Sequence, residues 1–439
     1  MTVLIENYGC ELNKAEMNSI ITSLNGIGIE TTTDIKTPEK NIDAVIINTC
    51  SVRGSAEERV LGRIAHHNGL KKRNKKLKIY VTGCMADRIG EELKKKFKGI
   101  TAVVKNNDKL SIPLMIKEED SFIRKGNSEY PFAKYYASKN DLNAYVPIMN
   151  GCNNFCTYCI VPYVRGREVS RSADDIINEI LYIDKMNIHV ITLLGQNVNS
   201  YSFEKNGSRI TFTDLVKQIE SLDLKNIVSI RFESPHPKDF STELIQTLKT
   251  AKYFSHHFHI PIQSGNSRIL SLMNRRYTRE EALSLFERIK NAIPDATFSL
   301  DLMVGFPSET KSEFNDTLLF VKEVGPIDAF MYYWNKREGT KAAEITTGII
   351  SEEQKIQRLE TLIAFQRANA VKIKQGRLGM RRKVCASHVS RNNKNEWFGF
   401  DTQTLESVVF AQENCQRGDI YSVRLDSLNG NTYKATVIK

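Results

Sequence analysis

Three cysteines lie close together in the chain, at Cys152, Cys156 and Cys159, in the pattern C-x3-C-x2-C. Cysteine thiolates are the ligands that hold iron–sulfur clusters, and a cubane cluster has four irons to ligate. Three thiolates therefore leave one iron without a protein ligand. An open iron can chelate a small molecule and pass an electron to it. The triad predicts a cluster that does chemistry rather than one that only stores an electron.

Zinc is the main alternative for cysteines at this spacing. A structural zinc site favours four ligands, usually a C-x2-C pair matched by a second pair or by histidines. The sequence has no second C-x2-C pair and no histidine near the triad. Unrelated interior cysteines would be scattered rather than grouped. The spacing therefore favours the iron–sulfur cluster over both alternatives.

The first 115 residues alternate short apolar strands with helices. The expected strands are Val3–Asn7, Ala44–Asn48, Ile79–Thr82 and, as a fourth candidate, Thr101–Val104. The expected helices are Leu12–Leu24, one that begins near Ser55, and one from Asp87 to about Phe97. This alternation indicates a doubly wound parallel sheet.

Three further cysteines occupy the same place in this pattern. Cys10, Cys50 and Cys84 each follow a predicted strand and precede a helix. Ligands of open parallel sheets bind outside the carboxyl ends of the strands, so three loops at this edge can gather three distant thiols. We expect a second three-cysteine cluster there. The alternative is that each is an ordinary small buried residue.

After a polar stretch at 107–140, expected to be a helix end and a linker, the alternation resumes at Ala144. The expected strands are Tyr145–Met149, His189–Leu194, Ile227–Phe232, Phe258–Ile262, Thr297–Val304 and Ala329–Tyr333. Six strand–helix units are too few for an eight-stranded barrel and predict an open, partial (β/α)6 barrel. The cluster loop follows its first strand, and the chemistry of such barrels lies at the carboxyl ends of the strands.

The last part of the chain changes character. Ser351–Gln375 is expected to form a long amphipathic helix that closes the side of the barrel and ends at Gly376. The expected strands after it are Arg382–Ser387, Glu406–Ala411, Asp419–Leu425 and Thr432–Ile438. Residues 371–439 carry 12 Lys and Arg against 6 Asp and Glu. Their net charge, 12 − 6 = +6, is more than half of the chain's net charge of +11. A small basic β-barrel is an RNA-binding format.

Composition excludes several classes of protein. No stretch approaches 18 uninterrupted apolar residues, so no membrane span is expected. The N-terminus lacks the basic region, apolar run and cleavage site of a signal peptide, so a cytoplasmic location is expected. Eight cysteines in a chain of this kind suggest metal binding or catalysis rather than disulfides. A pI near 9.1 is compatible with a nucleic-acid partner.

With the aromatic Tyr158 before its third cysteine, the triad is the signature of radical S-adenosylmethionine (SAM) proteins. The chain resembles the radical SAM methylthiotransferase family over nearly its whole length. The motifs that carry the resemblance are Gly9–Asn13, Asn48–Arg53, Gly83–Ala86, Gly166–Arg171, Gly195–Tyr201, Ser234–Asp239, Pro261–Gly265 and Gly305–Thr310. The Gly195–Tyr201 stretch is similar to the branch that modifies prenylated adenosine in tRNA. Glu11 and Leu12 depart from the Gln-Met usual in that branch, and Ser308 replaces the usual glycine.

The resemblance implies three domains: residues 1–115 with an auxiliary cluster, a radical SAM core at 138–370, and a TRAM RNA-binding domain at 373–439. It implies two [4Fe–4S] clusters, one held by Cys152, Cys156 and Cys159 that cleaves SAM, and one held by Cys10, Cys50 and Cys84. A radical from SAM removes the hydrogen at adenine C2, and the auxiliary cluster donates a sulfur that a first SAM has methylated. The clusters must then face each other, with the first domain covering the barrel mouth.

Candidate cofactor contacts are suggested by position at the triad and at strand ends, and candidate RNA contacts by charged and aromatic residues in the last domain. The candidates for SAM binding lie at the triad and at strand ends: Tyr158, Gly195, Gln196, Ser234, Gln263 and Gly305. Polar residues at strand ends often only cap backbone groups, which is the alternative for each. The candidates for RNA contact lie in the last domain: Arg381, Arg382, Lys383, Arg391, Lys394 and Trp397. The mixture of charge and aromatic surface suits a single-stranded loop, although aromatics in a small barrel are mostly core.

Some residues are expected to be structural. Four histidines near barrel strands, His236, His256, His257 and His259, are interpreted as structural or substrate-lining. Cys385 and Cys415 are expected to be ordinary interior residues of the last domain. The basic run Lys71–Lys78 is a solvated turn or a contact for tRNA phosphates.

The expected reaction is methylthiolation of N6-dimethylallyladenosine beside the anticodon, in the anticodon stem-loop of tRNA. The alternatives are the same reaction on threonylcarbamoyladenosine or on an aspartate of a ribosomal protein, and a non-catalytic RNA-binding iron–sulfur protein. The reaction needs an electron donor such as flavodoxin or ferredoxin, and a monomer is expected.

Overall fold

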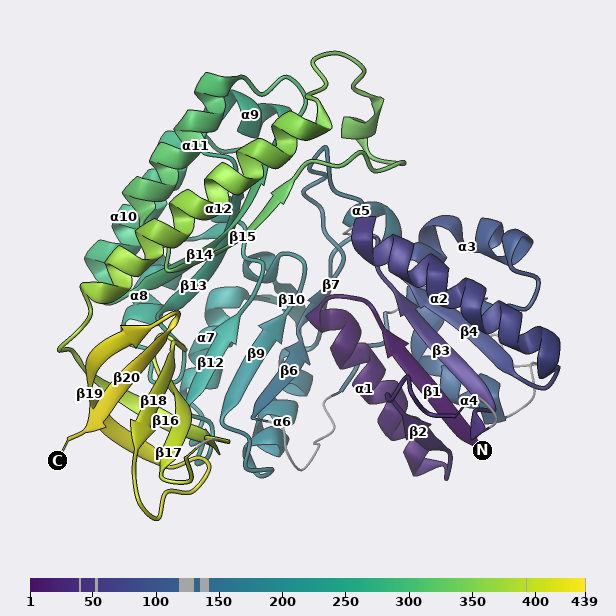
Figure 1. Ribbon diagram of the computed structural model, residues 1–439. Helices are drawn as coiled ribbons and strands as arrows, with labels where there is room; N and C mark the ends of the chain where they lie inside the picture. The colour runs from purple at the N-terminus through teal and green to yellow at the C-terminus, as the bar shows by residue number, and fades with distance from the viewer. Residues whose placement is uncertain (39–40, 52–53, 118–129, 135–141, 392, 439) are drawn as a thin grey trace.

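The computed structural model describes residues 1–38, 41–51, 54–117, 130–134, 142–391 and 393–438 (Figure 1). The start of the core domain expected at residue 138 and most of the expected linker lie outside these residues. Three bodies follow one another along the chain: a parallel sheet with helices on both faces, an open barrel of six parallel strands, and a small closed β-barrel. These are the three architectures expected from the sequence.

The first body is a five-stranded parallel sheet. Its strands, in the order β2-β1-β3-β4-β5, are β1 (Thr2–Asn7), β2 (Glu30–Thr32), β3 (Ala44–Thr49), β4 (Lys78–Gly83) and β5 (Ala102–Val104). The helices are α1 (Glu11–Gly26), α2 (Gly54–Arg73), α3 (Cys84–Lys96) and α4 (Ile112–Lys117), with a 3-10 turn at Asn106–Ser111. Alternate strand residues enter two separate apolar cores, one under α2 and α3 and the other under α1 and α4. Both faces are therefore covered, which explains why every residue of β3 is buried.

The second body holds six strands in chain order. They are β6 (Asn143–Pro147), β9 (Val190–Leu194), β12 (Ser229–Phe232), β13 (His257–Gln263), β14 (Thr297–Val304) and β15 (Asp328–Tyr333). They form two three-stranded parallel sheets, which meet where Ile230 bridges Phe254 beside β12 and β13. Within the described residues no ladder joins β6 to β15, so the barrel is open there. The six expected strands are confirmed as a partial barrel.

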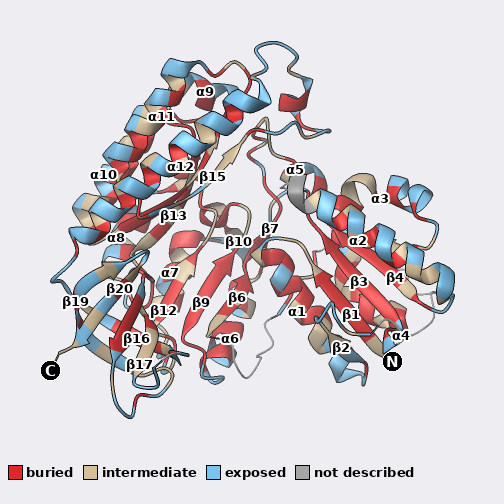
Figure 2. Cartoon of the chain, viewed as in Figure 1, coloured by how far each residue is buried: buried red, intermediate tan, exposed pale blue. Residues whose placement is uncertain are grey.

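Helices cover the outside of this barrel, with exposed outer faces and a buried strand layer beneath (Figure 2). They are α6 (Ala173–Asp184), α7 (Phe212–Glu220), α8 (Thr242–Lys249), α9 (Ser267–Leu272), α10 (Arg279–Ala292), α11 (Lys311–Val324) and α12 (Glu352–Gln375). The long helix α12 packs on β15 and α11 and ends at Gly376, as expected. None of the described helices is long and apolar enough to cross a membrane.

Several short elements were not expected from the sequence. The strand expected at Tyr145–Met149 is divided into β6 and β7 (Met149–Asn150), and β7 pairs with β8 (Val169–Ser170). The hairpin of β10 (Ser202–Lys205) and β11 (Ser208–Thr211) follows the second core strand. These elements, like β2, have two to four residues each, too few to show a periodic pattern.

The third body is a closed five-stranded barrel. Its strands, in the order β16-β17-β18-β20-β19, are β16 (Arg381–Val389), β17 (Glu396–Asp401), β18 (Ser407–Ala411), β19 (Ile420–Asn429) and β20 (Thr432–Val437). The sequence predicted all of these strands except β17. The aromatic stretch that includes Trp397, a candidate for RNA contact, forms this strand and completes the barrel.

The small barrel packs against the amino ends of the core strands (Figure 1). His189, His256 and Asp295 each lie just before a core strand, and each meets the barrel. The His256 amide donates to the Gln403 carbonyl over 2.7 Å, and Asp295 pairs with Arg382 at 3.2 Å. Gly418 lies so close to His189 that a Cβ on it would approach the imidazole to 2.4 Å. The barrel thus covers the end of the core opposite the carboxyl ends of its strands.

Candidate functional site

The loop that carries the first cysteine triad is held in shape by hydrogen bonds that do not use the thiols. The Cys152 amide donates to Gly166 O over 3.2 Å, and the Cys159 amide donates to Cys156 O over 3.0 Å. Thr157 donates from its amide to Met273 O and from its hydroxyl to Leu272 O. All eight cysteines are unbridged. The three thiols are therefore available as ligands in a loop whose backbone is already fixed.

The electrostatics of this triad suit a cationic group. Burial, followed by the neighbouring Cys156 thiol, raises the pKa of Cys159 to about 12. Burial also raises the pKa of Cys152, with a smaller contribution from Cys156. The thiols are thus close enough that the negative charge of one opposes that of the next. Bound metal ions invert this balance, because they stabilise adjacent thiolates.

The second cysteine set lies at the carboxyl edge of the first sheet, on three adjacent strands. Cys10 caps the amino end of α1 after β1, Cys50 follows β3, and Cys84 opens α3 after β4. Cys50 and Cys84 are buried, and Cys10 is exposed. Burial by the surrounding protein nevertheless raises the pKa of Cys10 overall. The charge of Arg165 opposes this increase, and the Cys84 thiol adds to it.

Polar side chains tie these three loops together. Asn48 donates from Nδ2 to Asn7 Oδ1 over 2.9 Å and to Asn13 O over 3.1 Å. Asn13 donates back to Thr49 O over 3.1 Å. The Thr49 hydroxyl donates to Thr82 O over 2.7 Å and accepts from the Met85 amide over 3.1 Å. The loops that carry Cys10, Cys50 and Cys84 therefore form one hydrogen-bonded unit.

Gly83 allows the chain to turn into Cys84, and its replacement tests this unit. Gly83 has φ +94°, and a Cβ there would lie 2.4 Å from Thr49 O. Gly83→Ala should cost at least about 1–3 kcal/mol of unfolding free energy and lower iron content, because the backbone conformation is essentially restricted to glycine. Urea unfolding and iron analysis measure the two effects.

The matched control is Gly62→Ala, in the middle of α2 with open space around the added methyl. It should leave iron content unchanged and stabilise the protein by about 0.5–1 kcal/mol. Equal effects at both glycines would show that the turn before Cys84 is not needed for metal loading.

The second cysteine set meets the segment that follows the first triad across the domain boundary. Cys84 packs against Ile160 and Val164, in the segment that follows Cys159. Asn106 of the first domain donates from Nδ2 to Val164 O over 3.2 Å. The segment after the first triad is therefore in direct contact with one residue of the second.

The first domain also bridges the open side of the barrel. Leu12 and Ala15 of α1 pack on Tyr145 of β6 and on Leu194, at the end of β9. On the other side, Glu57 of α2 lies 3.6 Å from Arg337, in the segment after β15. Contacts at both free edges place the first domain across the open side of the barrel.

A buried ionic cluster fixes this arrangement. Arg165 donates from Nη1 to Glu16 Oε1 over 2.9 Å and to Asn150 Oδ1 over 3.0 Å, and from Nη2 to Asn13 Oδ1. Lys109 and the Tyr130 hydroxyl also bond to Glu16. Burial alone would raise the pKa of Glu16, but the charges of Arg165 and Lys109 outweigh it and lower the pKa to about 2. Arg165 thus joins the loop after one triad to the helix that begins at Cys10.

The candidate cofactor residues lie at the carboxyl ends of the core strands. Ser234, Gln263 and Gly305 have φ of +59°, +78° and +71°. Two of these three are not glycines, and left-handed backbone at such residues is concentrated at functional sites. Gln196 accepts through Oε1 from the Gly151 amide, next to Cys152. A Cβ on Gly195 would lie 2.4 Å from Met149 Cγ, so a side chain there would displace the strand before the triad.

Tyr158 belongs to an apolar group with Ile269, Met273, Phe306 and Trp334. The sequence suggested that its ring contacts the adenine of a cofactor. The structure places it between the triad and the segments after β13, β14 and β15. It is therefore at the strand ends where the other candidates lie.

The asparagines of the Gly195–Tyr201 motif connect separate loops. Asn197 donates to Glu168 Oε1 over 3.3 Å and to Asp239 Oδ2 over 3.1 Å. Asn199 pairs with both backbone groups of His236, at 2.9 and 2.8 Å. The motif thus ties the loop after the triad to the loop after β12. Sequence reasoning did not assign these asparagines a role, although their place directly after a core strand was a usable signal.

Two of the four histidines line the inside of the barrel. Phe258 and Ile260 enter the core under the helices, so His257 and His259 point to the inner face. His257 contacts the Ser299 hydroxyl at 3.0 Å, and His259 lies 3.4 Å from Asp301. Burial lowers the pKa of His257 to about 3. These histidines are satisfied parts of a polar inner wall.

The candidate RNA residues do not all share one surface. Arg381, Lys383, Arg391 and Lys394 are exposed. Arg382 is instead engaged by Asp401 and Asp295 at the contact between the barrel and the core, so we withdraw it as an RNA contact. Trp397 packs partly against the barrel core. Cys385 and Cys415 are buried, as expected.

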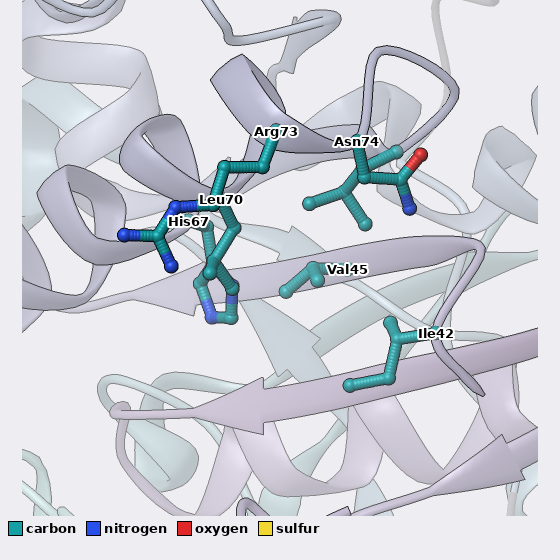
Figure 3. A pocket seen from close by; sticks show the side chains of 7 residues that line it. Ile42, Val45, His67, Leu70, Arg73 and Asn74 are labelled. Carbon is teal, nitrogen blue, oxygen red and sulfur yellow. The ribbon is translucent and has the colours of Figure 1, made fainter. Parts of the chain in front are cut away.

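The described residues also contain a cavity of about 190 Å³ in the first domain (Figure 3). It lies at the end of α2 and is lined by Ile42, Val45, His67, Leu70, Arg73, Asn74 and Leu77. Ile42 and Leu77 precede β3 and β4, so the cavity is at the amino edge of the sheet, opposite the cysteines. It is separate from the site described above.

No three histidine, cysteine or carboxylate side chains of the described residues converge as the ligands of a single ion do. Each thiolate of a cluster binds a different iron, so a cluster does not require this convergence. Both triads remain compatible with clusters.

Comparisons with known proteins agree with this geometry. Residues 146–321 match the model of the Radical SAM superfamily, and residues 2–105 match Uncharacterized protein family UPF0004. The tRNA-2-methylthio-N(6)-dimethylallyladenosine synthase of Treponema denticola is 39% identical, over 100% of both chains. Its namesake from Parabacteroides distasonis is 36% identical, over 98% of this chain and 94% of the relative.

Among solved structures, the radical SAM methyltransferase TsrM from Kitasatospora setae, with cobalamin and a [4Fe–4S] cluster bound, covers 78% of this chain and 77% of its own. The TM-score is 0.57 at 14% sequence identity. This likeness shows the fold alone.

Proposed function

The chain belongs to the family of tRNA-2-methylthio-N(6)-dimethylallyladenosine synthases, and from this premise we propose which of its residues perform the reaction. It is a radical SAM methylthiotransferase that modifies tRNA and uses SAM and a [4Fe–4S] cluster. The product is the 2-methylthio form of N6-dimethylallyladenosine. We place the target nucleotide beside the anticodon, in the anticodon stem-loop.

The chemistry explains why this enzyme needs a radical. The hydrogen on adenine C2 is neither acidic nor readily displaced, so a general base has little to act on. When bound, the cluster supplies the electron that cleaves SAM and so provides the carbon radical that removes this hydrogen. The protein contributes placement and exclusion of competing reactions.

Cys152, Cys156 and Cys159 hold the SAM-cleaving cluster in this proposal. Cys10, Cys50 and Cys84 would hold a second [4Fe–4S] cluster, which would supply the sulfur of the methylthio group. The contact of Cys84 with Ile160 and Val164 is the observation that best supports the pair, because it sets one thiol of the second set beside the segment after Cys159. A substrate base bound between them would be within reach of both.

The residues at the carboxyl ends of the core strands surround SAM. We assign Tyr158, Gly195, Gln196, Ser234, Gln263 and Gly305 to this pocket. Gln196 orients the cysteine loop through the Gly151 amide. Ser234 and Gln263 have left-handed backbone, a conformation that is concentrated at functional sites, which supports their assignment to the pocket.

The remaining assignments concern partners. Residues 1–115 carry the second cluster, residues 138–370 form the catalytic core, and residues 373–439 bind tRNA. We assign Arg381, Lys383, Arg391, Lys394 and Trp397 to RNA contact, with exposed charges meeting phosphates and the indole stacking on a base. A small electron-transfer protein such as flavodoxin or ferredoxin reduces a monomeric, cytoplasmic enzyme.

Iron and sulfide analysis tests the number of clusters. After anaerobic reconstitution the protein should hold about eight irons and eight sulfides per chain, and Cys10, Cys50 and Cys84 replaced together by alanine should leave about four of each. The reconstituted enzyme should convert tRNA that carries N6-dimethylallyladenosine to its methylthio form, measured by nucleoside analysis. About four irons in the unmodified protein would refute the second site, and a fully loaded enzyme that never alters this tRNA would refute the substrate.

A further inference from the structure

We propose that Arg275 is a positioning residue that donates a hydrogen bond to the Cys156 thiolate and raises the reduction potential of the SAM-cleaving cluster. The inference rests on the proposed role of the first triad. It goes beyond that role, because it assigns the control of the cluster's potential to a residue far from the cysteines in sequence.

The geometry of Arg275 is defined by three partners. Nη1 lies 3.4 Å from Cys156 Sγ, Nη2 donates to Pro261 O over 2.6 Å, and Nε donates to the Tyr277 hydroxyl over 3.1 Å. The Tyr277 hydroxyl in turn donates to Ile262 O over 2.8 Å. The guanidinium is therefore held against the end of β13 with one edge directed at the thiol.

The preceding residue holds the same loop through its backbone. Asn274 donates from Nδ2 to Asn154 O over 3.3 Å and to Phe155 O over 3.0 Å. Residue 274 thus holds the cysteine loop just before Cys156, and residue 275 contacts the Cys156 thiol itself. This makes the distance from the guanidinium to the sulfur a fixed feature of the fold.

The charge of Arg275 is the second observation. Four arginines of the described chain are buried: Arg165, Arg171, Arg275 and Arg377. Glu16, Glu179 and Glu406 pair with the other three. No carboxylate of the described residues forms an ion pair with Arg275, which is 5% exposed. A buried charge without a counter-ion is costly, so this position calls for an anion, and a thiolate-ligated cluster supplies one.

The expected effect on the potential follows from the charge change. Reduction adds one negative charge to the cluster and its thiolates. A cationic hydrogen-bond donor stabilises that charge, so it favours the reduced state and raises the potential. Without Arg275 the cluster should be harder to reduce. A weak electron donor should then fail to reduce the cluster, whereas a strong reductant should still succeed.

The test uses protein in which Cys10, Cys50 and Cys84 are alanine, so that only one cluster is present. Arg275→Met removes the charge, and an EPR-monitored redox titration should show a lower midpoint potential. SAM cleavage with a weak donor should fall at least about tenfold, which is the usual scale for losing such a contact. A strong low-potential reductant should restore it. Arg276→Met is the matched control, because the adjacent arginine is exposed, and it should leave the potential unchanged.

Two outcomes decide the matter. An Arg275→Met protein with full iron content and an unshifted potential overturns the inference. If that variant does not take up iron, Arg275→Gln, which also removes the charge but keeps a polar side chain, carries the test: a lowered potential supports the inference and an unchanged one overturns it. Failure of the parent protein to bind iron at all would instead refute the proposed function of the triad.

Discussion

Cys156→Ser should reduce both SAM cleavage and methylthio transfer to background. The substitution removes one of three thiolates from the loop that the Gly166 and Met273 carbonyls hold in place. The loop would then lack one of the three ligands that would hold the cluster, so the electron for SAM cleavage would not be supplied. Chromatography of the products 5′-deoxyadenosine and methionine measures SAM cleavage. Nucleoside analysis of the tRNA measures transfer of the methylthio group.

Cys50→Ser should separate these two activities. It alters the second set alone, so SAM cleavage should continue while methylthio product disappears. Cys385→Ser is the control, because this buried cysteine lies in the small barrel and outside both sets. Persistent methylthio product from the Cys156→Ser protein would refute the radical mechanism, and persistent product from Cys50→Ser would refute the second cluster.

Glu16→Gln should destabilise the protein by about 3–5 kcal/mol, the cost of removing one partner from a buried ion pair. Arg165 and Lys109 would both lose their carboxylate in a buried setting. The domains should then separate, because Glu16 belongs to the first and Arg165 to the second. Urea unfolding measures the stability, and hydrogen exchange in α1 reports the contact directly in protein without clusters.

The same variant should lose methylthio transfer more than SAM cleavage, since the first triad lies wholly in the core. Glu92→Gln, on the exposed side of α3, is the matched control and should change stability by no more than about 0.5 kcal/mol. A Glu16→Gln protein as stable as the parent would show that the ionic cluster does not hold the domains together.

The stability that the ionic cluster around Glu16 contributes depends on pH in a defined direction. The folded pKa of Glu16 is lowered to about 2, below the value near 4.3 expected in the unfolded chain. Its contribution to stability is therefore complete above that unfolded value and is lost as the pH falls towards 2.

The sequence was sufficient to predict the parts of the site that depend on strand ends. The buried run of β3 and the apolar strands around it placed Cys10, Cys50 and Cys84 on one edge, because parallel strands share the direction of their carboxyl ends. The six core strands were found in the same way. The order of strands and helices along the chain and the hydrophobic pattern within each strand can be recognised from short stretches of the sequence.

The contacts that join the domains could not be predicted. Arg165 bonds to Asn13 across 152 positions, and Arg275 reaches Cys156 across 119. No spacing rule connects side chains so far apart in the chain. Arg382 illustrates a different limit: adjacent charges on a strand face opposite sides, so Arg382 meets Asp295 while its neighbours Arg381 and Lys383 stay exposed.

The small barrel packs at the amino ends of the core strands, and this position sets a minimum length for the RNA. In the proposed function the base to be modified binds at the opposite ends of those strands, so an RNA that contacts both places must run along the flank of the core. The enzyme then selects its substrate by the length of the RNA stem. A stem trimmed until it no longer spans that flank should still react at saturation but with a raised KM, and deleting the barrel should abolish the difference between long and short stems.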